Sequence, residues 1–363
     1  MKKTFKNAKG ITLVALVITI IILLILATIS IQSLTNTGLF EKAKEAKEKT
    51  KNATENQAKT LNEYEDELNK YVSGTTSTQK LANKVKVGDY VTFTPDALDS
   101  NAVSTLKTNL NTYSGNSSST VNAAIKRDDL KWRVLDVQNG QVRLISEVPT
   151  TSKIELKGYN GYNNAVKLID DACSTLYTNT KLANKVQNLK IEDITKYMKT
   201  QPTENTTPYS PTNKYYPEIL LKEKGQTINE TAGTELDVSE QTEFINQTTK
   251  PQVNSWTLRK TYWNQTMNNT DSFTDAKYYE LFINNGSNYP TYWMSSRCVL
   301  ANSNGAYFYV RFVFSGSVGA HSLCYSHDDE YSRVYAFRPC ITLNSNVQVA
   351  SGSGSSESPF NIQ

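Results

Sequence analysis

The sequence predicts an α+β protein in which a long N-terminal helix precedes a mainly antiparallel β head with short helices. Three observations carry this prediction. The chain of 363 residues opens with an apolar run of helical length, continues with a segment free of proline and glycine, and then breaks into strand-like runs between turn residues. With 2 histidines, 4 cysteines and a net charge of +4 spread along the chain, we expect no enzyme activity, no cofactor or metal, and no nucleic-acid partner.

The N-terminal apolar run predicts a membrane span. Four lysines precede Gly10, and residues 11–31 are apolar apart from three threonines and a serine. A transmembrane helix needs about 20 apolar residues, and hydroxyl groups can hydrogen-bond to carbonyls of their own helix. The basic leader favours the cytoplasmic side for the N-terminus. We therefore expect a transmembrane helix over residues 11–34, in a single-pass protein of the cytoplasmic membrane with its head outside.

Residues 1–31 resemble the N-terminus of type IV pilins and pseudopilins. In the family pattern G-[FM]-T-L-[IV]-E, the residues Gly10, Thr12, Leu13 and Val14 match, and Ile11 is an acceptable variant. The resemblance implies a leader peptide at residues 1–10, cut by a prepilin peptidase after Gly10, with N-methylation of Ile11. It also implies that the helix serves first in membrane lipid and then in packing against other pilin-like subunits.

Ala15 departs from this pattern, because the family carries glutamate at the fifth mature position. A charge in lipid costs several kcal/mol unless it is paired, and in filaments this glutamate is thought to meet the N-terminal amine of a neighbouring subunit. Minor subunits at the filament tip can lack the glutamate. The resemblance thus implies a minor or tip component of a pilus or secretion pseudopilus, and leaves open whether the chain polymerises.

Residues 35–72 predict an amphipathic stalk helix. Good helix formers dominate, and acids precede lysines by four residues in Glu45/Lys49 and Asp66/Lys70. A spacer helix without further role fits the same pattern. A Ser/Thr/Gly-rich linker over residues 73–83 leads to the head, residues 84–350, and a disordered tail is expected over residues 351–363.

The head combines one clear hairpin with two short helices. Asn139-Gly140 between alternating apolar residues predicts a hairpin with a type I′ turn. Apolar residues three and four apart predict a helix over residues 166–176. Acids at Glu192 and Asp193, followed by Lys196, match the helix dipole and predict another helix over 191–198. Polar composition predicts an exposed excursion at 101–125 and a long irregular insertion at 205–270. Four strand-like runs follow, at 292–300, 306–314, 322–327 and 334–343.

The head resembles an uncharacterised extracellular domain of surface proteins from monoderm bacteria. Its closing strands, with a Trp-x-x-Ser segment at Trp293 and an Arg-Pro pair at Arg338, look weakly like the C-type-lectin fold. The resemblance spans residues 84–349 without the insertion. The sugar-binding tripeptides of C-type lectins are absent.

The cysteines Cys298, Cys324 and Cys340 lie in the C-terminal strand region, and Cys173 lies on the first predicted helix. Buried thiols and at least one disulfide are both open, the most plausible bridges being Cys298–Cys340 and Cys324–Cys340. Zinc is not expected, since no matched spacing of cysteine or histidine occurs.

Aromatic and acidic residues near the C-terminus form a candidate ligand face. Exposed tyrosine and tryptophan can stack on sugars or anchor protein partners, and residues 321–333 place two histidines and three acids in one expected loop. A solvated acidic turn or a core position explains the same residues. The candidate face consists of Tyr292, Trp293, Tyr325, Asp328, Asp329 and Glu330.

We therefore expect a pilin-like structural and adhesive subunit whose partners are prepilin peptidase, pilin-like subunits, membrane lipid and a surface glycan or protein ligand. The alternative is a membrane-anchored receptor or adhesin, with a lectin-like head, that does not polymerise.

Overall fold

The computed structural model describes residues 79–200, 270–284, 290–302, 305–325 and 329–363, with isolated positions between 42 and 57, between 241 and 244, and at 265–266. The chain divides into two compact units, Met1–Ser77 and Thr78–Gln363. No helix within the described residues is long and apolar enough to cross a membrane. The predicted leader and the span at 11–34 lie outside these residues, as do most of the stalk and of the 205–270 insertion.

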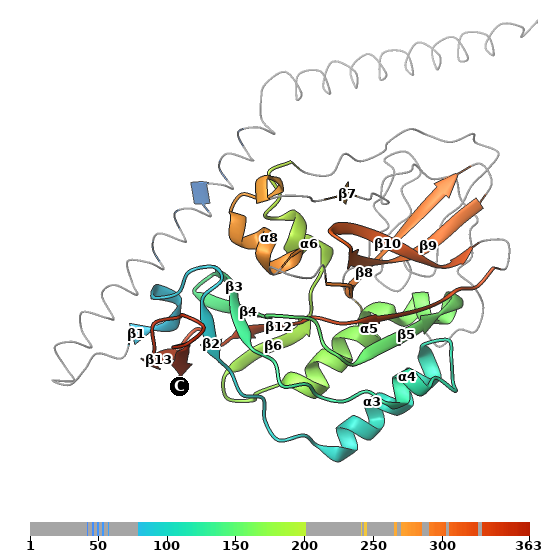
Figure 1. The fold of residues 1–363 in the computed structure, drawn as a ribbon, viewed down its shortest axis with the longest axis horizontal. Helices are drawn as coiled ribbons and strands as arrows, with labels where there is room; N and C mark the ends of the chain where they lie inside the picture. The colour runs from blue at the N-terminus through green and yellow to red at the C-terminus, as the bar shows by residue number, and fades with distance from the viewer. Residues whose placement is uncertain are drawn as a thin grey trace, which may run out of the picture. The chain divides into compact units, whose positions relative to one another are not determined.

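The second unit, here called the head, is a mixed α+β structure dominated by β-sheet, as predicted (Figure 1). Its strands form two sheets that are antiparallel except for the pairs β14/β2 and β11/β8. Sheet A has the order β1 (Gln79–Lys80), β13 (Gln348–Ser351), β14 (Phe360–Ile362), β2 (Tyr90–Thr92), β3 (Trp132–Gln138), β4 (Gln141–Ser146), β12 (Pro339–Leu343), β6 (Ala183–Asn188). Sheet B has the order β5 (Lys153–Lys157), β11 (Ser332–Ala336), β8 (Tyr292–Asn302), β9 (Gly305–Phe314), β10 (Ser317–Tyr325), β7 (Gln265–Thr266).

Helix α5 (Gly158–Tyr177) packs against strands of both sheets and against α3. It contains the predicted helix 166–176, and the apolar side chains that predicted it, including Val166, Ile169 and Leu176, are fully buried. Its first turn receives the carboxylate of Glu330, whose Oε1 accepts a hydrogen bond from the Tyr159 amide at 3.4 Å. The helix and the inner faces of the sheets form the larger hydrophobic core.

The segment 101–125, predicted as an exposed excursion, is largely exposed or half-exposed, but most of it is helical and one side of it is buried. Helix α3 (Ser100–Tyr113) begins after Asp99, whose side chain accepts a hydrogen bond from the Asn101 amide. Leu106 and Leu110 are buried on its inner side. A short helix, α4 (Thr120–Ala123), follows. The polar composition concealed these helices because only one narrow side of α3 meets the core.

Asn122 of α4 protects the outer edge of β5. Its Oδ1 accepts a hydrogen bond from the Glu155 amide at 2.8 Å, and its Nδ2 donates to the Glu155 carbonyl at 3.1 Å. Nδ2 also donates to Ser114 Oγ at 3.0 Å. The side-chain amide thus makes the two bonds that a further strand would make, and an unpaired strand edge is covered.

The Asn139-Gly140 hairpin is confirmed. Strands β3 and β4 pair through the loop Asn139-Gly140, whose φ angles of 51° and 73° are both positive, as a type I′ turn requires. The predicted helix at 191–198 is confirmed but shorter, as α6 (Ile191–Thr195). Asp193 accepts a hydrogen bond from the Lys190 amide at its start. Together with α8 (Ala276–Phe282), α6 covers a second hydrophobic cluster.

The four predicted C-terminal strand regions are confirmed as β8, β9, β10 and β11–β12. The last region is two strands in different sheets, because the chain crosses from sheet B to sheet A between Ala336 and Pro339. Arg338 is 1% exposed at this crossing and donates to the carbonyls of Ser146 and Glu147 at 2.9–3.2 Å. Its guanidinium therefore ties the crossing to the end of β4.

The predicted disordered tail at 351–363 is wrong, as is the predicted extent of the linker to residue 83. Strand β14 lies between β13 and β2 in sheet A, with Phe360 only 7% exposed. Glycines Gly352 and Gly354 turn the chain at φ of 99° and 83°. The Gly/Ser-rich segment therefore forms a turn that leads the chain back into the sheet. Residues 79–80, expected in the linker, form β1 against β13.

Candidate functional site

The candidate ligand face is not assembled as predicted. Tyr292 and Trp293 are both fully buried, so their assignment to an exposed face is wrong. The Tyr292 hydroxyl donates to the Phe282 carbonyl at 2.8 Å, and Trp293 Nε1 donates to the Ile154 carbonyl at 3.0 Å. Tyr292 and Trp293 are adjacent in β8, so their side chains point to opposite faces of the strand, and each packs in one of the two hydrophobic clusters. They are core residues whose polar atoms are satisfied.

The remaining residues of that face are scattered. Tyr325 is half-buried and stacks on Tyr307 with ring centroids 4.2 Å apart. Asp329 is exposed, and Glu330 is occupied at the start of α5. Asp328 lies outside the described residues. Nothing in the described part of the chain joins these side chains into one binding surface, and no group of three potential metal ligands occurs there.

The expected loop at 321–333 begins instead within β10, which carries both His321 and Cys324. Nδ1 of His321 lies 2.7 Å from the Tyr335 hydroxyl, and its ring stacks on Phe312. Burial lowers the pKa of His321 to about 4, so the imidazole is neutral at physiological pH. This histidine is a packed strand residue.

The four cysteines are buried thiols. Cys298 and Cys324 lie in sheet B, whereas Cys340 lies in sheet A. Burial raises the pKa of the Cys173 and Cys340 thiols well above the ordinary value. Such thiols are poor nucleophiles, because the reactive thiolate is disfavoured in apolar surroundings.

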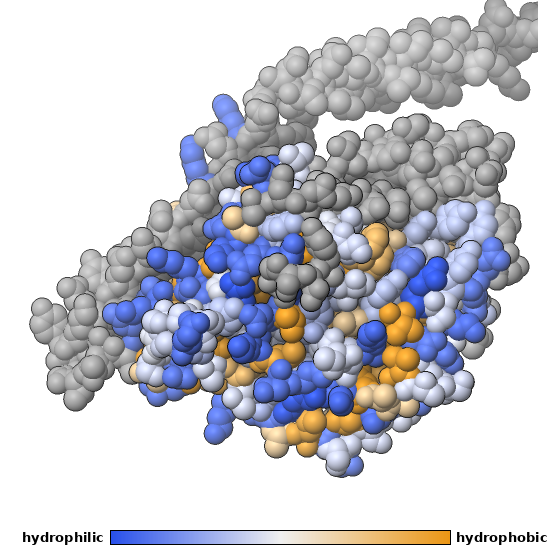
Figure 2. All heavy atoms as spheres, in the orientation of Figure 1, coloured by the Kyte–Doolittle hydropathy of each residue, from blue (hydrophilic) through white to orange (hydrophobic). Residues whose placement is uncertain are grey.

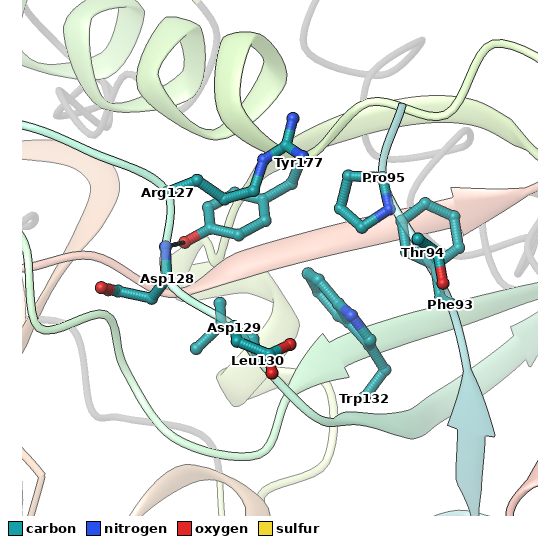
Figure 3. Close-up of a pocket in the computed structure, with 9 residues that line it drawn as sticks. All are labelled: Phe93, Thr94, Pro95, Arg127, Asp128, Asp129, Leu130, Trp132 and Tyr177. Atoms are coloured by element: carbon teal, nitrogen blue, oxygen red, sulfur yellow. Dashed lines mark hydrogen bonds between the residues drawn. The ribbon is translucent and has the colours of Figure 1, made fainter. Parts of the chain in front are cut away.

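A pocket at the end of α5 is the strongest candidate site in the described residues. Its volume is about 350 Å³, within the range of roughly 300–1,000 Å³ usual for small-molecule sites. Three segments far apart in sequence line it: the exit of β2, the loop before β3 with Trp132, and the last residue of α5 (Figure 3). The lining residues are Phe93, Thr94, Pro95, Arg127, Asp128, Asp129, Leu130, Trp132 and Tyr177.

Trp132 forms the centre of the pocket wall. It meets Phe93 edge to face at 5.4 Å between ring centroids and Tyr177 at 5.8 Å. The three rings belong to the larger core and are at most 4% exposed. Because the rings are held by the core, the edges that border the pocket have fixed positions.

Hydrogen bonds between the three segments also fix the rim. Arg127 donates through Nε to the Leu176 carbonyl at 2.6 Å and through a terminal nitrogen to the Asp96 carbonyl at 2.7 Å. The Asp128 amide donates to the Tyr177 hydroxyl at 3.0 Å (Figure 3). The pocket is therefore built before any ligand arrives, which reduces the entropy that binding would cost.

The two rim carboxylates differ in their surroundings. Asp128 accepts hydrogen bonds from the amide and hydroxyl of Thr151, both at 2.6 Å, and it points away from the aromatic rings (Figure 3). Asp129 is exposed on the side of Trp132, and its carboxylate makes no hydrogen bond or ion pair within the described residues. Asp128 therefore holds the loop to Thr151, and the Asp129 carboxylate remains available to a ligand.

Sequence reasoning missed this pocket, because it used the residues that precede Asn139-Gly140 only to predict a hairpin. The neighbouring acids in Asp128-Asp129-Leu130-Lys131-Trp132 were the one local signal. The face drawn in Figure 2 shows hydrophobic residues in small groups among hydrophilic ones. The exposed large hydrophobic residues of the described chain are Leu98, Val137 and Val148.

Comparison with known proteins adds no relative. No family model, no curated protein and no solved structure matches this chain.

Proposed function

We propose that this chain is a pilin-like subunit of the cytoplasmic membrane, assembled through its N-terminal helix as a minor or tip component of a type IV pilus or secretion pseudopilus. Its head contributes structure and adhesion and performs no catalysis. The observation that carries the proposal is the junction Gly10-Ile11, where a basic leader meets an apolar run long enough to span a membrane. The division of the chain at residue 77 supports the separation of an N-terminal module from the head.

Mature protein from the native host tests the processing step. Intact-mass and N-terminal sequencing should find a chain that begins at N-methylated Ile11. A Gly10→Leu variant should accumulate in the membrane as a slower-migrating precursor, because the peptidase requires a small residue before the cut. Gly38→Leu, outside the leader, is the matched control and should be processed normally. A mature chain that retains Met1 contradicts the proposal.

Ala15 favours a second candidate function, a surface-anchored adhesin that does not polymerise. Without a carboxylate at this position, the N-terminal amine of a neighbouring subunit lacks its partner in the lipid-like filament interior. Mechanical shearing separates the two candidates. A filament subunit appears in the sheared fraction and leaves it when the assembly ATPase is deleted, whereas an anchored adhesin stays with the membrane in both cases.

A further inference from the structure

Helices α3 and α5 pack against each other, and the end of α3 is fixed to the first turns of α5 (Figure 1). Asn160 Nδ2 of α5 donates to the Thr112 carbonyl of α3 at 3.3 Å. Three side chains near this junction contact one short segment from a distant part of the chain. They are called here the α3–α5 surface and consist of Tyr113, Asn164 and Lys167.

The aromatic ring of Phe244 lies on this surface. It stacks on the ring of Tyr113, with centroids 4.2 Å apart and an angle of 4° between the two planes. The ammonium group of Lys167 lies 4.9 Å from the centroid of the same Phe244 ring. Parallel stacking and a nearby cation are both attractive for an aromatic side chain. The α3–α5 surface therefore selects an aromatic residue at this position.

Gln241 adds polar contacts three positions before the aromatic residue. Its Nε2 donates to Asn164 Oδ1 at 3.4 Å, and its Oε1 accepts from the backbone amide of Lys167 at 3.4 Å. Nε2 also donates to the Glu243 carbonyl at 2.9 Å, which ties Gln241 to the backbone next to Phe244. The two side chains are thus presented together, as a Gln-x-x-Phe unit.

This contact lies at the surface of the head and not in its core. Gln241, Phe244, Tyr113 and Lys167 are all half-buried. Both hydrogen bonds to α5 are 3.4 Å long, at the upper end of hydrogen-bond distances. Contacts that bury few apolar atoms open at a small cost in free energy. Because the two helices hold the α3–α5 surface in place, the surface remains formed when the segment leaves.

We propose that the α3–α5 surface is a peptide-docking site whose occupant is the chain's own Gln241 and Phe244, held there as an autoinhibitory contact. The ligand chemistry is that of a short peptide with an aromatic residue and, three positions earlier, a side-chain amide. No acid is required opposite Lys167, since its ammonium is already paired with Asp171 at 2.9 Å. The site is separate from the Trp132 pocket and from the residues around Tyr325, and it does not depend on the pilin assignment.

The test measures binding of a fluorescein-labelled peptide of residues 239–248 to the full chain in micelles of lauryldimethylamine oxide, by fluorescence anisotropy. In a Gln241→Ala/Phe244→Ala chain the own segment no longer competes, so the peptide should bind saturably. The wild-type chain should bind it at least about tenfold more weakly, because a tethered segment competes at a high effective concentration. A peptide with alanine in place of Phe244 should bind the double variant at least about tenfold more weakly than the unaltered peptide.

Tyr113→Ala, added to the double variant, should also weaken binding at least about tenfold, whereas Tyr113→Phe keeps the ring and is the matched control, with an affinity within about twofold. Comparing the two peptides on one unchanged protein keeps the test valid even if Tyr113→Ala does not fold. The proposal is overturned if the double variant does not bind the peptide, if it binds no better than the wild type, or if both peptides bind equally. A wild-type dimer that dissociates in the double variant, seen by analytical ultracentrifugation, would place the segment of a second copy on this surface and overturn the contact within one chain.

Discussion

Asn122 shows how much one side chain contributes to this head. It is fully buried, and its side-chain amide hydrogen-bonds both the backbone N–H and the backbone carbonyl of Glu155 at the edge of β5. Asn122→Ala removes the partner of the partly buried amide and carbonyl of Glu155, so we expect the free energy of unfolding to fall by about 2–4 kcal/mol. Urea denaturation measures the loss. Asn184→Ala, at an exposed position of β6, is the control and should change stability by less than about 0.5 kcal/mol.

Asp170 and His321 give opposite pH dependences over nearly the same range. Burial raises the pKa of Asp170 from 3.8 to about 6, with Lys190 and hydrogen bonds from Ser295 and the Asn188 amide opposing the shift. The folded state therefore holds this proton more tightly than the unfolded state, and the contribution to stability falls as pH rises from about 4 to about 6. The neutral His321 contributes stability that falls as pH decreases from 6.5 to about 4.

Two variants separate these titrations. Asp170→Asn should gain stability relative to the wild type as pH rises from about 4 to about 6, because its amide bears no charge to bury. His321→Gln should gain relative stability in the other direction, as pH falls from 6.5 to about 4. Urea midpoints at half-unit steps of pH provide the measurement. Parallel curves for a variant and the wild type would contradict the assignment for that residue.

At the scale of elements, two glycines with similar backbone angles make different demands. Gly140 has φ of 73° and space for a Cβ, with no atom within 4 Å. Gly115, between α3 and α4, has φ of 86°, and a Cβ there would lie 1.9 Å from the Lys157 carbonyl oxygen. Gly140 is therefore needed only for its positive φ, whereas Gly115 is needed for its positive φ and for the close approach of its backbone to that of Lys157.

The same substitution distinguishes these demands. Gly140→Ala should cost about 1–2 kcal/mol, the price of a left-handed conformation for an L-residue. Gly115→Ala should cost on the order of 4 kcal/mol, because β5 must also move away from the α3–α4 loop. Thermal and urea unfolding of the two variants test this order. Equal losses would show that the contact at Lys157 carries no energy.

The sequence predicted correctly those elements that form through interactions between residues close together in the chain. The Asn139-Gly140 hairpin and α5 are of this kind, since turn chemistry and three-to-four spacing are visible in a short window. Helix α3 escaped prediction because its stability comes from Leu106 and Leu110 packing on distant residues. The pocket escaped for the same reason: Pro95, Asp129 and Tyr177 are far apart in sequence and lie together only in the folded head. Burial of Tyr292 and Trp293 likewise depends on which elements cover β8.

At the scale of the whole molecule, the C-terminal strand belongs to the core. Phe360 is 7% exposed within the larger core, and its neighbour Asn361 is exposed. Phe360→Ala should lower the free energy of unfolding by about 3–5 kcal/mol. Asn361→Ala, which loses one exposed hydrogen bond to Ser351, should cost less than about 1 kcal/mol. Limited proteolysis should release the last strand early in Phe360→Ala, and resistance equal to the wild type would contradict this account.

The pairing of β1 with β13 and of β13 with β14 brings the two ends of the head together. Strands two places apart in a sheet are separated by about 10 Å, a gap that a few glycine and serine residues span. The head is thus topologically close to a ring, and a circular permutant that joins residue 363 to residue 79 keeps every strand pairing of sheet A. New termini opened at the Asn139-Gly140 turn would leave the Trp132 pocket intact on a head whose chain no longer begins at residue 79.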